Sequence, residues 1–176
     1  PIGDWYAAQS KVGRVLNYGA SAAWTFARIS EMENLKMEAE LLWFQKAFSL
    51  EKWVNDAASS EQIKNIVDRV EQGIQEGSIG IGINAGYSPG GGYKELLAIH
   101  QLAAKYSVPA FTHISGDFPN DPKSAAENIG QIISYAAAAG SQEHICHINS
   151  SSLKDITTTK EMVLGAQKRG LPVTVE

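Results

Sequence analysis

Apolar residues along the chain follow two alternating patterns, one typical of amphipathic helices and one of short buried strands. Apolar positions three and four residues apart predict helices over residues 59–77, 93–106, 124–140 and 158–169. Residues 26–48 are helix-forming in composition, whereas residues 1–13 show no clear period. Three of the helices begin with a capping-box pattern, at Ser59 with Gln62, Ser124 with Glu127 and Thr158 with Glu161.

Short apolar runs bounded by turn residues separate these helices and predict strands over residues 15–21, 78–84, 109–115, 143–149 and 173–176. Strands and helices therefore alternate, which favours a parallel sheet with crossover helices. The predicted fold class is α/β, with about five parallel strands. An open doubly wound sheet and a partial (β/α)8 barrel are both compatible with this pattern.

Composition and charge narrow the classes of partner. The chain is 44% hydrophobic and 19% charged, with a net charge of −4 and no basic run, so nucleic acid is not an expected partner. No apolar run has the length of a membrane span, and no signal peptide opens the chain, so no membrane partner is expected either. The single cysteine, Cys146, fits a reducing compartment, and we expect a cytoplasmic protein.

The two ends suggest a piece of a longer chain. The sequence has no initiator methionine and stops inside a strand-like run, so we expect residues 1–176 to be the central part of one domain with both ends missing. The glycine-rich dinucleotide fingerprint and the P-loop are both absent from the sequence.

Two histidines follow neighbouring predicted strands. His113 and His147 each lie at the end of an apolar run, with a small polar residue two positions later, Ser115 and Asn149. The carboxyl ends of parallel strands meet at one edge of a sheet, where chemistry is usually performed, and imidazole is a common zinc ligand. A shared metal ion is therefore one interpretation of the pair. Two strand-end side chains that simply hydrogen-bond to loops are the other.

Strand alternation assigns the neighbours of these histidines to faces. Phe111 and Ser115 should share the face of His113, and Ile145 and Asn149 that of His147. His144 and Cys146 should then point toward the covering helices. We expect His144 to be a satisfied histidine at the sheet–helix boundary, Cys146 an inert buried thiol, and His100 a surface or helix-packing residue.

Order and context add a family resemblance. The segments EGSIGIGINAGYSPG, PAFTHIS, HICHINS and LPVTVE, in this order, resemble the amidohydrolase superfamily, in particular its D-aminoacylase and N-acyl-D-amino-acid deacylase branch. The resemblance runs from about Val12 to the end and is strongest over residues 77–150. It implies a zinc-dependent (β/α)8 barrel, with one or two zinc ions, that hydrolyses an amide bond of a small-molecule substrate.

The resemblance also implies roles for individual residues. His113 and His147 match metal ligands of the fifth and sixth strands, and Tyr87 matches an aromatic position that contacts substrate. The first-strand HxH or HxD pair, the bridging ligand of an early strand and the catalytic aspartate of the last strand would lie outside this chain. We therefore expect five of the eight strands here, roughly the third to the seventh.

Ser115 and Asn149 are candidate substrate-binding residues that depart from the family pattern. They stand where D-aminoacylases place basic residues to hold the substrate carboxylate. Neither side chain can pair a carboxylate as arginine or lysine does. The substrate class therefore stays open between an N-acyl amino acid-like molecule and a cyclic amide.

Two other functions remain open. One is a non-catalytic binding or structural module derived from a barrel; the other is an open-sheet enzyme that holds a phosphate or sugar at the loop Gly90 to Gly92. A zinc site needs three or four ligands, so these residues alone should be inactive. We expect them to associate as a homo-oligomer or to be completed by the rest of the parent chain.

Overall fold

The strands form one parallel sheet. The computed structural model describes residues 2–38, 41–114 and 124–176. Within them the strands are β1 (Ala22–Ala23), β2 (Ile81–Asn84), β3 (Ala110–His113), β4 (Glu143–Ile145) and β5 (Val173–Val175). Their order in the sheet is β1-β2-β3-β4-β5, the same as in the sequence, and every pairing is parallel. The predicted α/β class with five parallel strands is confirmed. Among the described strands the order does not reverse, so they lack the switch point of a doubly wound sheet.

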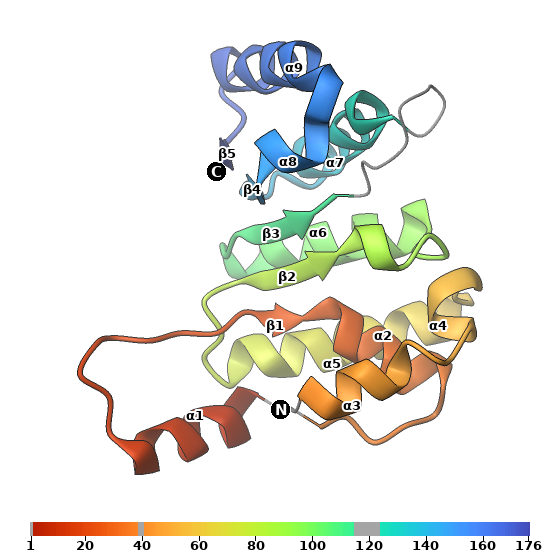
Figure 1. The fold of residues 1–176 in the computed structure, drawn as a ribbon, viewed down its shortest axis with the longest axis vertical. Coiled ribbons are helices and arrows are strands. Elements are labelled where there is room, and N and C mark those ends of the chain that lie inside the picture. The colour runs from red at the N-terminus through yellow and green to blue at the C-terminus, as the bar shows by residue number, and fades with distance from the viewer. Residues whose placement is uncertain (1, 39–40, 115–123) are drawn as a thin grey trace.

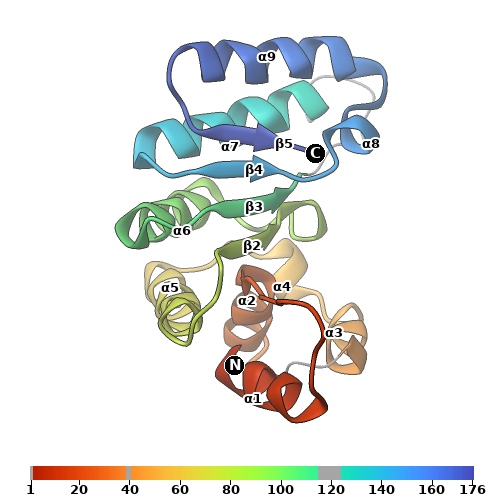
Figure 2. The ribbon, with the colours of Figure 1, turned by 90° about the vertical axis from the view of Figure 1, so that its left-hand side faces the viewer.

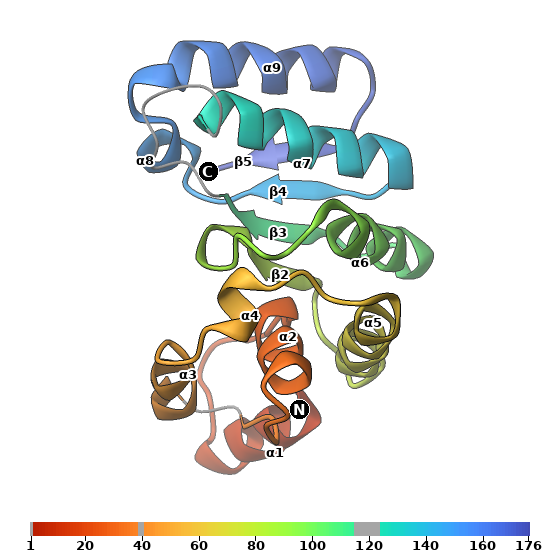
Figure 3. The same cartoon turned by 90° about the vertical axis from the view of Figure 1, so that its right-hand side faces the viewer.

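Helices cover one face of this sheet. The long helices that follow or precede the strands are α5 (Ser60–Gln75), α6 (Tyr93–Tyr106), α7 (Ala125–Ala139) and α9 (Ile156–Lys168). Figure 2 and Figure 3 show them stacked in this order along the sheet, while Figure 1 looks onto the face that they leave open. A singly wound sheet with all its crossover helices on one side is the arrangement of part of a (β/α)8 barrel.

Shorter helices surround this frame. They are α1 (Ile2–Val12), α2 (Trp24–Met32), α3 (Leu41–Ala47), α4 (Lys52–Asn55) and α8 (Ile148–Ser152), with the 3-10 turns η1 (Ala85–Tyr87) and η2 (Leu153–Asp155). In the part of the chain that the structure describes, no helix combines the length and the apolar character that crossing a bilayer requires.

The core lies between the sheet and its helices. Alternate strand residues point into this layer, so Ile81 and Ile83 of β2 and Ile145 of β4 are fully buried. They pack against apolar helix residues such as Ile99 of α6 and Ile129 of α7. The intervening strand residues face the open side, which is where a barrel would have its interior.

A second, smaller core fixes the loop after β2. Trp53 of α4 is fully buried in a cluster with Ile29, Met32 and Ala47. The carbonyl oxygen of Trp53 accepts a hydrogen bond of 2.7 Å from Ser88 Oγ, and Gly90 N donates to the carbonyl of Val54 at 2.7 Å. The loop that carries Tyr87 is therefore attached to α4.

Helices with local capping signals were predicted well. The range 93–106 is observed as α6, and α5 starts after Ser59, whose reciprocal hydrogen bonds with Gln62 form the predicted capping box. Ser124 caps α7 by accepting a hydrogen bond from the backbone N–H of Glu127, and Gly140 ends that helix in a left-handed conformation.

Four other predictions are corrected. Residues 15–21 form no strand, because Val15 and Leu16 are almost fully exposed and have no apolar surface to pack on; β1 lies just beyond them. Residues 26–48 hold the end of α2 and the separate α3, since Asn34 breaks α2 with a positive φ of 53°. The predicted strand 143–149 ends at Ile145.

The fourth correction concerns the start of the last helix, where Thr158 lies inside α9 rather than capping it, because η2 leads directly into that helix at Ile156. In addition, residues 2–12 form the helix α1, which the sequence pattern did not indicate.

A candidate metal centre at the carboxyl ends of β3 and β4

His113 is the last residue of β3 and faces the open side of the sheet. The burial of β3 alternates, with Ala110 and Thr112 fully buried beneath the helices and Phe111 and His113 only partly buried. The backbone of His113 is paired in register with Asn84 at the end of β2. The sequence prediction that Phe111 shares the face of His113 agrees with this alternation.

His147 reaches the same edge by a different route. Strand β4 ends two residues earlier, at Ile145, and His147 then adopts the left-handed conformation, with φ 40° and ψ 50°, as the residue before α8. Between them, Cys146 N still donates to the carbonyl of Thr112 on β3 at 2.9 Å. The turn therefore starts while the chain is still held beside β3, and this brings His147 next to His113.

This turn overturns the predicted faces of three neighbours. Ile145 belongs to the core under the helices, whereas the ring of His144 lies edge-on to Phe111, with centroids 5.8 Å apart, on the open side. Cys146 is only partly buried and lies close to His144 on that side. The prediction placed His144 and Cys146 toward the helices because it extended strand alternation past Ile145, where the strand has ended.

The two histidine rings meet directly. His113 Nδ1 lies 2.8 Å from His147 Nε2, and the ring centroids are 4.6 Å apart. The other ring nitrogen of His147, Nδ1, lies 3.1 Å from the hydroxyl of Ser151, one turn along α8. A hydrogen bond of this kind to the second nitrogen orients a histidine for metal binding.

The spacing of the rings fits a shared ion. Two nitrogens bound to one tetrahedral zinc ion lie about 3.3 Å apart, so the rings would need to separate by only ~0.5 Å. The donors are imidazole nitrogens, which zinc accepts readily, and both come from residues whose backbones are fixed by strand pairing or by a helix start. Residues His113 and His147 therefore fit the metal that the family resemblance implies.

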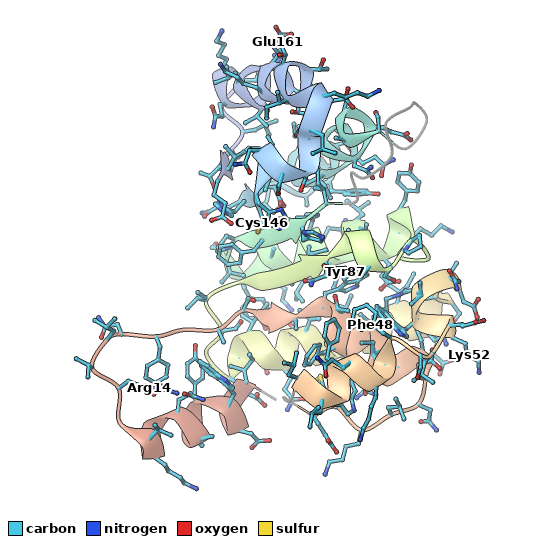
Figure 4. All side chains as sticks on the ribbon, in the orientation of Figure 1. Arg14, Phe48, Lys52, Tyr87, Cys146 and Glu161 are labelled. Atoms are coloured by element: carbon cyan, nitrogen blue, oxygen red, sulfur yellow. The ribbon has the colours of Figure 1, made fainter. Side chains whose placement is uncertain are left out.

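Tyr87 lies against this pair. Its ring stacks on the ring of His113, with centroids 5.1 Å apart and an interplanar angle of 17°. Its other contact is edge-on to Phe48, at 5.8 Å, and Figure 4 shows these two aromatic residues near each other on the open side. Gly86 makes the stacking possible, since a Cβ there would lie 3.0 Å from the carbonyl oxygen of Ile114 and 3.3 Å from the His113 ring.

The remaining predicted site residues are less central. Ser115 lies outside the described residues. Asn149 is exposed at the start of α8, and its side-chain oxygen accepts a hydrogen bond of 2.7 Å from Ser150 N. In the glycine loop, the N–H groups of Gly90 and Gly91 donate to Val54 O and Ser88 O, so two of the amides proposed for anion binding are already used.

His100 belongs to a separate buried polar group that the sequence did not reveal. It is fully buried between helices, its ring stacks on Tyr135 with centroids 5.5 Å apart, and its Nδ1 lies 3.8 Å from Glu143 Oε2. Burial lowers the pKa of His100 to about 4 and raises the pKa of Glu143 well above its usual range, so it disfavours the charged form of both groups. Of the two predicted places for His100, helix packing is confirmed. Its position four residues after the core residue Leu96 was the available signal.

Comparison with known proteins supports the same architecture. No protein-family model and no curated protein matches the chain. Among solved structures, N-acyl-D-glutamate deacylase from Bordetella bronchiseptica, in complex with zinc and a phosphonate inhibitor, is similar over 99% of this chain, with a TM-score of 0.74 and 14% identity. D-aminoacylase is similar over 70% of this chain, with a TM-score of 0.59 and 14% identity. The chain folds like part of a D-aminoacylase-type barrel.

The resemblance of the sequence to the D-aminoacylase branch is thereby confirmed at the level of the fold. The chain spans 33% of the N-acyl-D-glutamate deacylase and 26% of the D-aminoacylase. A further D-aminoacylase structure, described as having a binuclear metal centre, gives a TM-score of 0.59 at 12% identity. The edge of the D-aminoacylase-like sheet where His113 and His147 meet is the carboxyl edge, at which barrel enzymes carry their active sites.

Proposed function

We propose that this chain is part of a metal-dependent amidohydrolase that cleaves an amide bond of an N-acyl amino acid-like or cyclic amide substrate. The observation that carries the proposal is the contact between His113 Nδ1 and His147 Nε2, 2.8 Å apart at the carboxyl edge of the sheet. The fold shared with zinc-bound N-acyl-D-glutamate deacylase supports it.

In this proposal His113 and His147 hold one zinc ion through Nδ1 and Nε2, and Ser151 keeps the His147 ring in place through its other nitrogen. Bound zinc would supply a water with a pKa near 7 and would polarise the scissile carbonyl. The described residues provide two ligands of the three or four that such a site needs. The remaining ligands, the aspartate that accepts the proton of the water and any second zinc ion belong to the rest of the proposed barrel.

Tyr87 would provide one wall of the substrate site. Its ring is stacked on His113 yet 44% exposed, so one part of it is available to an incoming group. Ser115 and Asn149 would offer neutral hydrogen-bonding groups to the substrate. Because neither carries a positive charge, we propose that the substrate group recognised there is held by hydrogen bonds rather than by a charge pair.

The experiment combines metal analysis with hydrolysis. The parent protein that completes the proposed barrel is purified and loaded with zinc, its metal content is measured, and it is assayed against a panel of N-acyl-D-amino acids and cyclic amides. We expect His113→Asn and His147→Asn each to remove metal from the site and to abolish zinc-dependent hydrolysis. Lys160→Ala, at an exposed position of α9, serves as the control and should retain both the bound metal and the zinc-dependent hydrolysis.

The two possible failures separate the competing functions. If the metal content of both histidine variants equals that of the unmodified protein, the proposed centre is wrong. If the histidines bind metal but no member of the panel is hydrolysed, the chain is better described as a non-catalytic module derived from this barrel.

A further inference from the structure

A second group of ligand-type side chains lies on the open face of the sheet, nearer to β5. It consists of His144 on β4, Cys146 just after β4 and Glu176 just after β5. One ligand atom of each lies within 4.8 Å of the others, and His144 Nε2 is 4.0 Å from Glu176 Oε2. In Figure 4 Cys146 is seen on the side of β4, away from Tyr87 and Phe48.

Hydrogen bonds determine which nitrogen of His144 is available. The hydroxyl of Thr174 has one proton, which it donates to the carbonyl oxygen of Glu143 at 3.3 Å. With that proton engaged, we assign to His144 the tautomer in which Nδ1 carries the proton and donates it to Thr174 Oγ1, 2.8 Å away. In a neutral imidazole this leaves a lone pair on Nε2, the atom that faces Glu176. This orientation by a partner on the second nitrogen is typical of metal-binding histidines.

The backbones of the other two residues are also held. Cys146 N donates to Thr112 O at 2.9 Å, and Ile148 N donates to Glu176 O at 2.9 Å. The Glu176 side chain is 64% exposed and can rotate. Donor atoms around a tetrahedral zinc ion lie about 3.3 to 3.8 Å apart, so movement of this side chain and a small rotation at Cys146 suffice to close the site.

The site is separate from the His113 and His147 pair, although Cys146 precedes His147 in the sequence. The two ring nitrogens of His147 already face His113 and Ser151, so this histidine does not belong to the second group. A donor set of imidazole, thiolate and carboxylate is suited to zinc, whereas magnesium and calcium prefer oxygen ligands alone. We propose that His144, Cys146 and Glu176 form a second zinc site, which links the ends of β4 and β5.

Cobalt titration of the purified, metal-free protein tests this proposal. Cobalt(II) replaces zinc and gives a near-ultraviolet charge-transfer band only when a thiolate is among its ligands. Because Cys146 is the single cysteine of the sequence, the band reports on this site alone. We expect the band in the unmodified protein, its loss in Cys146→Ser, and an apparent dissociation constant about 10- to 100-fold higher in Thr174→Val, which removes the partner of His144 Nδ1.

His113→Asn shows whether the two sites are independent. We expect this variant to keep the charge-transfer band with an unchanged cobalt affinity, even though it loses the proposed catalytic metal. Absence of the band in the unmodified protein would mean that the group is only a hydrogen-bonded and ionic contact. Loss of the band in His113→Asn would place Cys146 in the first centre. Either result overturns the proposal and leaves the proposed hydrolase function to be judged separately.

Discussion

The two faces of the sheet carry different kinds of side chains, although they alternate along the same strands. Under the helices β2 and β4 contribute the fully buried Ile83 and Ile145. On the open face β3 and β4 contribute His113 and His144, partly exposed and linked to polar partners. Residues one position apart therefore pack in the core on one side and present histidine side chains on the other. The following predictions test this division, from the largest expected effect to the smallest.

Truncating the covered face should destabilise the fold most. Ile83→Ala removes a fully buried side chain from a packed layer, so the free energy of unfolding should fall by about 2 to 5 kcal/mol. The same substitution at Ile79, which is 55% exposed, is the matched control and should change it by less than about 0.5 kcal/mol. Denaturant unfolding measures both, and equal losses would contradict the division of faces.

The buried histidine under the helices should make stability depend on pH. The pKa of His100 is about 4 in the folded chain and 6.5 when free. The contribution of neutral His100 to the free energy of unfolding is therefore complete above pH 6.5 and is lost as the pH falls toward 4. The loss is on the order of 3 kcal/mol. Its facing groups are Glu143, whose pKa is also raised by burial, and Tyr135, whose pKa of about 12 keeps it uncharged in this range.

The measurement compares unfolding free energy against pH in the unmodified protein and in His100→Gln. The variant should show a smaller decline between pH 6.5 and 4, whatever its stability at neutral pH. Parallel curves would mean that His100 is not kept neutral by burial.

On the open face, Ser151→Ala should weaken metal binding while leaving the fold intact. The hydroxyl of Ser151 lies 3.1 Å from His147 Nδ1, and losing such a partner typically lowers metal affinity by about 10- to 100-fold. Ser134→Ala, at an exposed position of α7, is the control and should bind metal normally. Competition with a zinc chelator gives the affinities. If both serine variants bind alike, Ser151 does not orient the ring.

The smallest effect is expected at the start of α5. Ser59→Ala removes the hydroxyl that accepts from Gln62 N, so the free energy of unfolding should fall by about 1 kcal/mol, with no change in metal affinity. Ser60→Ala alters the adjacent exposed serine, and the free energy of unfolding of this variant should lie within about 0.5 kcal/mol of that of the unmodified protein. A thermal or denaturant unfolding series would detect the difference, and equal effects would argue against the capping box.

Elements with signals inside their own segment could be predicted from the sequence. Helix α6 was predicted from its first residue to its last, because apolar spacing and the following Pro109 both act locally. The length of β4 could not be predicted in this way. It depends on partners distant in the sequence, since Ile145 is the last residue paired both with Thr112 and with Val175.

The candidate site was predictable in part for the same reason. The positions of His113 and His147 follow from the order of strands and helices, and the structure brings the two rings together as expected. The predicted face of His144 was wrong, because it depends on where β4 ends. The buried pair of His100 and Glu143 was missed, because it depends on which helix crosses which strand. Those are properties of the assembled sheet rather than of any single segment.

The left-handed backbone of His147 has a consequence for directed evolution. Glycine adopts this conformation without the steric cost of about 1 to 2 kcal/mol that other residues incur. A library screened only for heat resistance should therefore enrich glycine at position 147 and discard the imidazole. Heat-resistant descendants with that replacement would keep the architecture and lose one ligand of the proposed metal centre, so a screen for robustness must also select for metal binding.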